Sequence, residues 1–256
     1  MVFMKQMILT PLPGFPKIEP GDDLATLILE GLDRVKLSLQ DNDVIVIGQK
    51  VISKSEGCTR DLRLVTPSDE ARRLARESHK DAREVEVLLG ESRKILRIRV
   101  GLIIVEHKLG FICANAGIDH SNVDGEPGDW VLTLPPDPDA SAQEIRMRLQ
   151  ETARCEIGVL IIDSHGRAWR LGTVGTAIGV AGFPALLDLR GRPDLFGSPL
   201  QTTEVGLADE LAAAASIMMG QADEGHPVVH VRGLPYPLRD GSLAEILRPE
   251  DEDLFR

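Results

Sequence analysis

The sequence predicts an α+β protein, because strand-like and helix-like patterns both recur along its 256 residues. Runs rich in β-branched residues, such as 43–47 and 157–162, are typical of buried strands. Helix-start signals precede stretches in which apolar residues lie three and four apart, as in residues 21–33. Hydrophobic residues make up 43% and charged residues 27% of the chain, which is ordinary for a globular protein and excludes general disorder.

The first elements alternate between strand and helix. A short strand precedes the loop Thr10–Pro16, in which three prolines fix φ and exclude a helix. Gly21-Asp22-Asp23 then provides N-caps for a helix to about Asp33. Residues 43–47 form a buried strand that runs into the polar segment 48–57, and ligand groups often follow strand ends in this way.

The middle of the chain predicts one helix and several strands. Thr66–Glu70 is a strong helix start, and alternating charges as far as Lys80 indicate a solvated helix face. Residues 85–89 and 95–105 look like strands. Residues 111–139 form a loop-rich region with one strand near Trp130–Leu132, and such long loops are usually functional or mobile. We take residues 1–256 as one unit, with this region as the candidate boundary between two subdomains.

The second half predicts two helices around a central strand. Ser141–Glu144 is a capping box that opens a helix to about Arg154. Residues 157–162 are a central strand ending in Asp163-Ser164, residues 204–220 an Ala-rich helix, and residues 228–231 a further strand. The glycines between them allow two interpretations, either a phosphate cradle or close backbone packing and tight bends. We favour packing and bends, because the spacing of the glycines lacks the dinucleotide fingerprint and the chain has no P-loop. These glycines are Gly172, Gly175, Gly179 and Gly182.

Charge and apolar runs exclude several classes of partner. The chain has 29 Lys+Arg and 40 Asp+Glu, a net charge of −11, which argues against binding nucleic acid or an anionic membrane surface. No apolar run approaches the roughly 20 residues of a spanning helix, and the N-terminus lacks the apolar segment of a secretion signal. The three cysteines are scattered, as expected for reduced thiols, so we expect a cytoplasmic protein.

Two carboxylates, Asp119 and Asp163, stand where apolar segments end. With the Ser164 hydroxyl and an oxygen from Gln221 they would suit a hard divalent cation, which prefers oxygen ligands. The alternative is that each aspartate only caps a turn, which is the commoner use of this residue. Lys54 has a similar pair of interpretations, either a cation that balances phosphate charge or a solvated lysine at an edge.

Nine short motifs follow one another along the chain in a characteristic order. They are Pro13-Gly14-Phe15-Pro16, Gly21-Asp22-Asp23-Leu24, Ser53–Gly57, Asn115–Asn122, Asp137–Ala142, Asp163–Arg170, Gly175–Gly182, Ala208–Ala215 and Met219-Gly220-Gln221. Taken together, these motifs resemble the F420-0:gamma-glutamyl ligase family, which acts on the deazaflavin coenzyme F420. The resemblance extends from about Leu9 to about Gly233.

The resemblance implies an amide ligase. GTP would phosphorylate the terminal carboxylate of the deazaflavin precursor, and the amine of L-glutamate would attack the acyl phosphate, with further γ-linked glutamates added in turn. No covalent protein nucleophile is required. The resemblance also implies Mg²⁺ or Mn²⁺ and a monovalent cation such as K⁺ as cofactors. The fold it implies has mixed sheets with flanking helices, in an intertwined homodimer whose active site lies near the dimer interface.

The resemblance also assigns site residues by position. Those similar to the divalent-metal ligands are Asp119, Asp163, Ser164 and Gln221. Those similar to the GTP-contacting set are Pro13, Gly14, Phe15, Pro16, Gln49, Lys50, Lys54 and Asn122. A second GTP-contacting segment comprises Met219, Gly220, Gln221, Ala222, Asp223, Glu224 and Gly225.

Two alternatives remain open at this point. The first is a ligase on the same scaffold that acts on another carboxylate, in which case the metal and GTP residues would stay and the acceptor pocket would differ. The second is a non-catalytic nucleotide- or flavin-binding protein, which would bind ligand without releasing GDP.

Overall fold

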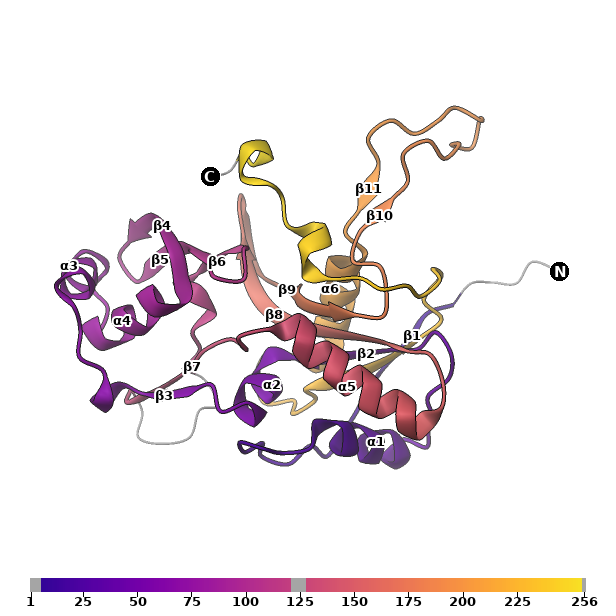
Figure 1. The fold of residues 1–256 in the computed structure, drawn as a ribbon, viewed down its shortest axis with the longest axis horizontal. Helices are drawn as coiled ribbons and strands as arrows, with labels where there is room; N and C mark the ends of the chain where they lie inside the picture. The colour runs from indigo at the N-terminus through magenta and orange to yellow at the C-terminus, as the bar shows by residue number, and fades with distance from the viewer. Residues whose placement is uncertain (1–5, 121–127, 255–256) are drawn as a thin grey trace.

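The computed structural model describes residues 6–120 and 128–254, and its centre is a mixed five-stranded sheet (Figure 1). The strand order is β1-β12-β2-β8-β9. β2 and β8 are parallel, and the other neighbouring pairs are antiparallel. The bounds of these strands are β1 Ile8–Pro11, β2 Val44–Gly48, β8 Gly158–Arg167, β9 Arg170–Ala181 and β12 Val228–Arg232.

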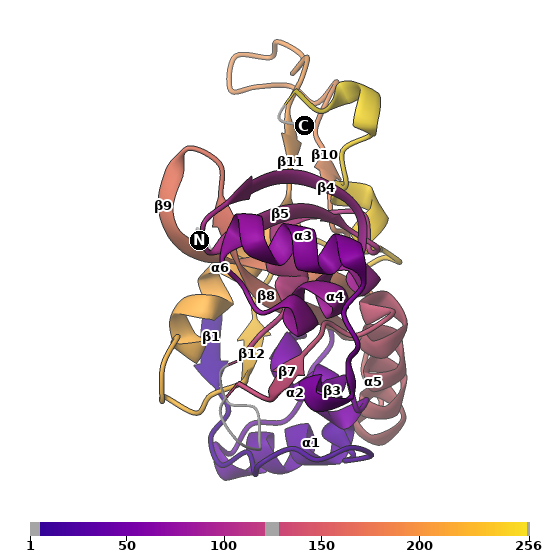
Figure 2. The ribbon, with the colours of Figure 1, turned by 90° about the vertical axis from the view of Figure 1, so that its left-hand side faces the viewer.

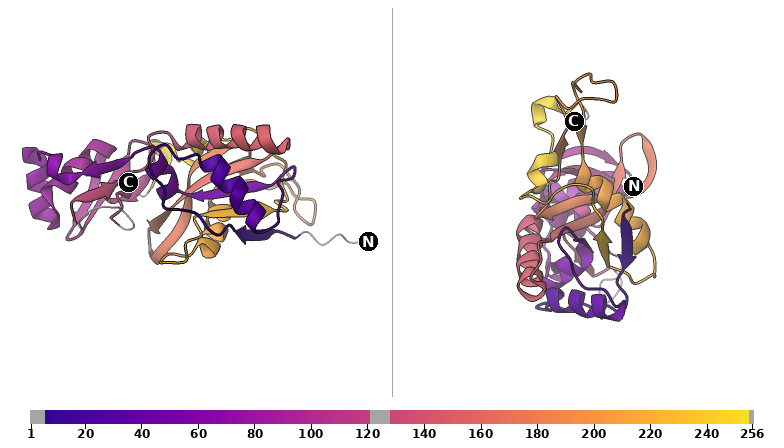
Figure 3. Two further views of the ribbon diagram at one scale, coloured as in Figure 1. Left: turned by 90° about the horizontal axis from the view of Figure 1, so that it is seen from below. Right: turned by 90° about the vertical axis from the view of Figure 1, so that its right-hand side faces the viewer.

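Helices cover both faces of this sheet. Because side chains alternate along a strand, β2 sends Ile45 and Ile47 to one face and Val44 and Val46 to the other. The first face packs against α1 (Leu24–Arg34) and α5 (Pro138–Ala153), and the second against α6 (Leu207–Met219). Figure 3 shows the resulting layers from below and from the side. The predicted α+β class with mixed sheets and flanking helices is therefore confirmed.

A second body of structure lies beside the main sheet, at the left of Figure 1 and toward the viewer in Figure 2. Its own apolar cluster joins two helices to a three-stranded antiparallel sheet. The elements are α3 Asp69–Ser78, α4 Ala82–Glu91, β4 Ser92–Arg99, β5 Leu102–His107, β6 Ile112–Ala114 and the 3₁₀ turn η2 Asn115–Gly117.

The remaining elements connect or extend these two bodies. Short helix α2 follows β2 directly, and β3 pairs antiparallel with β7. β10 and β11 form the base of an arm that projects from the main body (Figure 1). Bounds are α2 Gln49–Ser55, β3 Thr59–Asp61, η1 Leu62–Leu64, β7 Trp130–Leu132, β10 Leu187–Asp188, β11 Glu204–Val205, η3 Leu243–Ile246 and η4 Glu250–Glu252. Among the described residues, no helix is both long and apolar enough to cross a bilayer.

Two strand predictions in the second body are wrong. Residues 85–89 lie in helix α4, because the Asp81 side chain accepts a hydrogen bond from the Arg83 amide and caps that helix. Residues 95–105 are not one strand but parts of β4 and β5, with a turn at Val100-Gly101. Gly101 has φ +79° there, a conformation that suits glycine, and Val100 is exposed.

Three boundaries in the second half also differ from prediction. The helix predicted from residue 204 begins at Leu207, because Glu204–Val205 pair with β10 as strand β11. Helix α5 begins at Pro138 rather than at a capping box, because Asp137 caps it and the Ser141 hydroxyl donates to Glu56 Oε1 instead. Strand β8 continues past Asp163-Ser164 to Arg167, because β9 pairs with it along this whole length. The loop-rich region 111–139 contains β6 and η2 in addition to the predicted strand, which is β7.

Gly175 and Gly179 of β9 serve close packing, as the interpretation favoured above predicts. Gly172 does not, because a Cβ there would meet nothing within 4 Å, and its φ of +83° is that of a tight bend. A Cβ added at Gly175 would lie 2.5 Å from the Ala212 carbonyl oxygen and 2.6 Å from Ser216 Cβ on α6. A Cβ added at Gly179 would lie 2.5 Å from the Pro138 carbonyl oxygen of α5. The helices on both faces therefore approach the backbone of β9 directly.

We expect Gly175→Ala to lower the free energy of unfolding by about 2 kcal/mol, because α6 has to move to admit the methyl group. Gly166→Ala on the neighbouring strand is the control, since a Cβ there meets nothing within 4 Å. Urea unfolding of both variants measures the difference. Equal free energies of unfolding for the two variants would show that α6 moves to admit the methyl group without loss of stability.

Candidate functional site

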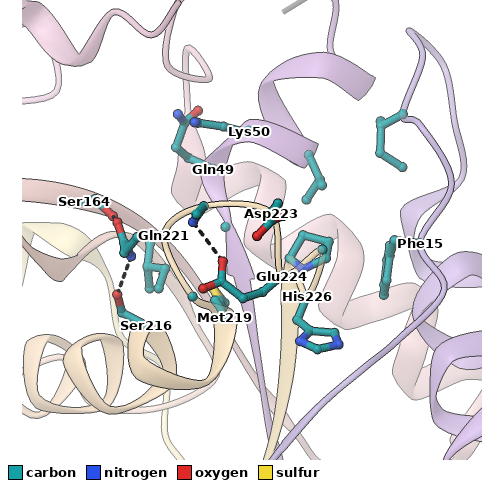
Figure 4. A pocket seen from close by; sticks show the side chains of 18 of the residues that line it. Phe15, Gln49, Lys50, Ser164, Ser216, Met219, Gln221, Asp223, Glu224 and His226 are labelled. Carbon is teal, nitrogen blue, oxygen red and sulfur yellow. Dashed lines mark hydrogen bonds between the residues drawn. The ribbon is translucent and has the colours of Figure 1, made fainter. Parts of the chain in front are cut away.

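A cavity of about 530 Å³ lies where four segments far apart in the sequence meet (Figure 4). They are the loop after β1, the start of α2, the Ile162–Ser164 part of β8, and the turn 219–227 between α6 and β12. Cavities of several hundred cubic ångströms are typical of small-molecule sites. The position of this one makes it the candidate functional site.

Strand pairing explains why α2 and Asp163 lie together. Gly48, the last residue of β2, is paired with Ile162 of β8 in the parallel ladder. The next residues along the two strands, Gln49 and Asp163, therefore follow the end of the β2/β8 ladder on the same side of the sheet, where β2 ends and β8 continues beside β9 alone. Ligands commonly bind at the carboxyl ends of parallel strands, so this edge places two polar side chains where chemistry is expected.

The turn after α6 is held against the same edge. The Gly48 amide donates to the Pro227 carbonyl at 2.8 Å. Gly220 ends α6 with φ +76°, and a Cβ there would lie within 2.1 Å of Glu224 Cδ, so this position requires glycine. Glu224 accepts a 2.8 Å hydrogen bond from the Ala222 amide. Hydrogen bonds from the amides of Ala222, Glu224 and Gln221 lower the pKa of the Glu224 carboxyl, so the amides of this turn already face a carboxylate.

A row of oxygen atoms lines another side of the cavity. The Ser164 hydroxyl donates to Gln221 Oε1 at 3.0 Å, and Gln221 Nε2 donates to the Ser216 hydroxyl at 3.0 Å. Figure 4 shows this row running from β8 to α6. The two bonds orient the Gln221 amide so that its oxygen faces Ser164. Two predicted metal ligands are thus in direct contact.

The other two predicted metal ligands each contact a cationic or ionisable side chain. Asp163 Oδ2 lies 2.9 Å from His165 Nε2, within ion-pair distance although the angles are not those of a hydrogen bond. Asp119 Oδ2 lies 2.8 Å from Lys50 Nζ. Asp163 lines the cavity, whereas Asp119 is outside the described lining and reaches it through Lys50.

Gln49 brings a buried polar group to the cavity wall. Its side-chain oxygen accepts from the Ser53 hydroxyl at 2.8 Å, and the residue is only 2% exposed. Within the part of the chain that the structure describes, Gln49 Nε2 has no hydrogen-bond partner. Leaving a buried amide donor unsatisfied costs about 1–3 kcal/mol, so a ligand acceptor in the cavity would be stabilised by it.

The cavity gathers most of the predicted nucleotide residues. Those that line it are Phe15, Pro16, Gln49, Lys50, Lys54 and Met219–Gly225. Pro13 and Gly14 precede the lining part of their loop, and their carbonyl oxygens accept hydrogen bonds from Arg34 Nη1 at 3.4 and 3.0 Å. Asn122 lies outside the described residues.

Several lining residues were not predicted. Lys17 and Ile18 follow Pro16 directly, so the extent of the first loop was the missing signal. His226 and Pro227 likewise extend the predicted turn. Ser216 joins the site only because α6 packs across β9, and nothing in its local sequence indicates this.

The residues present fit a hard divalent cation. The available donors are carboxylate, hydroxyl and amide oxygens, the types that Mg²⁺ and Mn²⁺ prefer. Among the described residues there is no group of three His, Cys, Asp or Glu side chains that could hold a metal ion. Magnesium usually keeps several waters and binds one or two carboxylates with substrate phosphates, and Asp163, Ser164 and Gln221 match that pattern.

Comparison with known proteins identifies the family. The family model described as F420-0:Gamma-glutamyl ligase matches residues 14–233. A protein from Methanothermobacter thermautotrophicus named coenzyme F420:L-glutamate ligase is 48% identical over 246 residues, covering 95% of this chain and 96% of the relative. Proteins of the same name from Methanopyrus kandleri and Methanocaldococcus jannaschii are 45% and 44% identical, covering 96% and 90% of this chain and 96% and 93% of their own. With most of its length matched by the model and by these relatives, the chain belongs to the F420-0:gamma-glutamyl ligase family.

Proposed function

We propose that this chain is a GTP-dependent ligase that joins L-glutamate to the carboxylate of a coenzyme F420 precursor through an amide bond. The relatives that it matches over nearly their whole length are named coenzyme F420:L-glutamate ligase. The observation that carries the proposal is the cavity at the edge of the β2/β8 pair, which combines lysines, a turn whose amides face a carboxylate and a row of side-chain oxygens.

The lysines and amides suit the nucleotide. Lys17, Lys50 and Lys54 line the cavity, although the whole chain carries a net charge of −11. The turn 220–225 already directs amides at the Glu224 carboxylate, and a phosphate oxygen is an anion of the same kind. Gln49 Nε2 adds a buried donor. These groups support GTP binding without a P-loop.

The reaction that we propose has two steps. A carboxylate oxygen of the precursor attacks the γ-phosphorus of GTP, the bond to the bridging oxygen breaks, and GDP leaves. The glutamate nitrogen then attacks the acyl carbon, the carbon–oxygen bond to phosphate breaks, and the amine releases a proton as the amide forms. Phosphoryl transfer asks the protein chiefly for positioning and for charge neutralisation, so no protein nucleophile is needed. Further γ-linked glutamates would be added in the same way.

A divalent cation, Mg²⁺ or Mn²⁺, would neutralise charge on the phosphate oxygens when bound. We propose that Asp163, Ser164, Gln221 and Asp119 hold it, and that a monovalent cation such as K⁺ also participates. Ser164 and Gln221 are already in contact, and Asp163 precedes Ser164 at the same strand edge. The Gln221–Ser216 hydrogen bond keeps the amide oxygen directed toward this group.

The direct test is to incubate the protein with GTP, Mn²⁺, K⁺, glutamate and the deazaflavin precursor. We expect GDP and phosphate to be released and the precursor to gain the mass of one or more glutamyl residues. Turnover with a different carboxylate instead would identify a ligase of another substrate on the same scaffold. Ligand-dependent melting shifts without GDP would identify a nucleotide-binding protein without turnover.

We expect Lys54→Met to raise the GTP concentration needed for half-maximal rate by about tenfold, because one cation on the cavity wall is lost. Since the side chain is only half-buried, the melting temperature should change little. Steady-state kinetics at varied GTP measure the effect, and the KM for glutamate serves as the internal control. An unchanged GTP requirement would assign Lys54 to a solvated edge.

We propose that the active unit is a homodimer. The arm between β10 and β11 projects from the body (Figure 2). It carries Leu195 and Phe196, which are 99% and 95% exposed. Large apolar side chains on projecting segments are typical of protein interfaces. Light scattering after gel filtration should give twice the chain mass of 27.9 kDa. Replacing Leu195 and Phe196 by Ser should lower that mass.

A further inference from the structure

We propose that Lys50 is a positioning residue that holds the Asp119 carboxylate, and that nucleotide must draw Lys50 away before Asp119 can bind a divalent cation. The inference rests on the proposed function, because it takes Asp119 as a metal ligand and the cavity as a nucleotide site. The inference adds an order of ligand binding: because Lys50 occupies Asp119, metal binding depends on nucleotide.

The geometry places Lys50 between the Asp119 carboxylate and the cavity. Lys50 Nζ lies 2.8 Å from Asp119 Oδ2, and the two side chains are 35% and 24% exposed. Lys50 also lines the cavity, whereas Asp119 is outside the described lining. Its side chain, at the start of α2, therefore contacts the aspartate and faces the space proposed for phosphates.

Asp119 is held by its backbone. Its amide donates to the Leu132 carbonyl and its carbonyl accepts from the Leu132 amide, both at 2.9 Å. The next residue, Thr133, donates its amide to the Cys58 carbonyl, and β7 pairs with β3 in the chain that follows α2. The aspartate thus extends from a fixed point, while Lys50 has a long stem with four rotatable bonds. Lys50, rather than Asp119, would therefore be the residue that moves from one partner to another.

Electrostatics then couples the two ligands. An ammonium 2.8 Å from a carboxylate oxygen occupies the place that a divalent cation needs, so the two cations compete for Asp119. Phosphate oxygens in the cavity would offer Lys50 another anionic partner. Nucleotide therefore releases the aspartate, and by linkage the metal strengthens nucleotide binding by the same factor.

The exchange predicts a gain of affinity, which structural damage would not produce. We expect Lys50→Met to bind Mn²⁺ about fivefold more tightly than wild type in the absence of nucleotide, the ratio that corresponds to about 1 kcal/mol for a partly exposed ion pair. The same variant should bind GDP more weakly in the absence of metal. The factor by which GDP improves Mn²⁺ affinity should consequently shrink.

The test measures free Mn²⁺ by electron paramagnetic resonance in titrations of the full chain, with and without saturating GDP. Lys50→Gln is a second uncharged variant in case Lys50→Met folds poorly, and Lys50→Arg retains the competing charge and should match wild type. Lys94→Met is the control for net charge, because Lys94 pairs with Glu250 on the surface of β4, outside the cavity lining.

The outcomes separate this inference from the proposed function. If Asp119→Asn loses Mn²⁺ binding in the presence of GDP while Lys50→Met and Lys50→Gln bind Mn²⁺ no more tightly than wild type without GDP, the exchange is wrong and the metal site stands. If Asp119→Asn binds Mn²⁺ and GDP as wild type does, the metal assignment fails and the exchange fails with it. Tighter Mn²⁺ binding by Lys94→Met would also overturn the exchange, since any lost cation would then suffice.

Discussion

Asp163→Asn is expected to lower the rate of ligation at least about a hundredfold while the protein stays folded, a loss of about 3 kcal/mol of transition-state stabilisation. Asn keeps the shape of the side chain but lacks the charge that a divalent cation requires. The backbone of Asp163 is secured by its pairing with Thr176 in the β8/β9 ladder, which the substitution leaves intact. GDP release and glutamyl addition measure the loss.

Asp188→Asn on β10 is the matched control, because it makes the same chemical change at an exposed position outside the cavity lining. That variant should turn over as wild type does. Circular dichroism and thermal melting should give the same folded signal for both variants. If the Asp163→Asn protein is unfolded, Asp163 has a structural role. If the variant is folded and fully active, Asp163 does not belong to the proposed metal site.

Asp43→Asn is expected to lower the free energy of unfolding by about 3 kcal/mol, because it removes the anion from a buried ionic cluster. Asp43 is 1% exposed and accepts hydrogen bonds from Arg232 Nε at 2.9 Å and Nη2 at 2.7 Å. His230 Nε2, also buried, lies 2.8 Å from Asp43 Oδ2. Urea unfolding measures the change.

The same cluster predicts how stability depends on pH. Burial alone would raise the pKa of the Asp43 carboxyl, but hydrogen bonds from Arg232 and His230 outweigh it and hold the pKa at about 2, below its ordinary 3.8. A lowered folded pKa stabilises the protein above the ordinary value, so this contribution, about 2 kcal/mol, is lost as the pH falls from about 4 toward 2. Asp43→Asn should flatten that part of the stability curve.

Asp188 again provides the contrast. Hydrogen bonds from Arg190 also lower the pKa of Asp188 to about 2, yet both side chains are 51% exposed. Water and salt screen such a surface pair, so Asp188→Asn should leave the unfolding midpoint unchanged. A larger loss of stability for Asp188→Asn than for Asp43→Asn would contradict this account of burial.

Local patterns predicted the elements that their own residues determine. The helix after Asp23, the β-branched strand at 44–48 and the Ala-rich helix ended by Gly220 all follow from capping, β propensity and periodicity within one short segment. The prediction failed at residues 85–89, where a short apolar run fits a strand or a buried helix equally well. Asp81, which caps α4, was the signal that would have decided it.

The candidate site was likewise predicted in part from local sequence, and the rest depended on tertiary contacts. Motif order alone indicated the family and most of the cavity wall, because the loop at 13–16 and the turn at 219–225 are each continuous in sequence. Motif order could not predict which segments that are distant in the sequence would contact one another. Ser216 enters the site because the small residues Gly175 and Ala212 let α6 approach β9, and Lys50 meets Asp119 because the Leu132 bridge holds that aspartate beside α2.

Composition and motif order thus defined the class of protein and the chemical types at its site, since both depend only on which residues occur and in what sequence. The partners of each charged group depended on the tertiary structure. Asp119 and Asp163 look alike as turn aspartates in the sequence, yet one is paired with Lys50 and the other lies against His165. Electrostatic energy depends on distance and burial rather than on separation along the chain, so only folding could distinguish them.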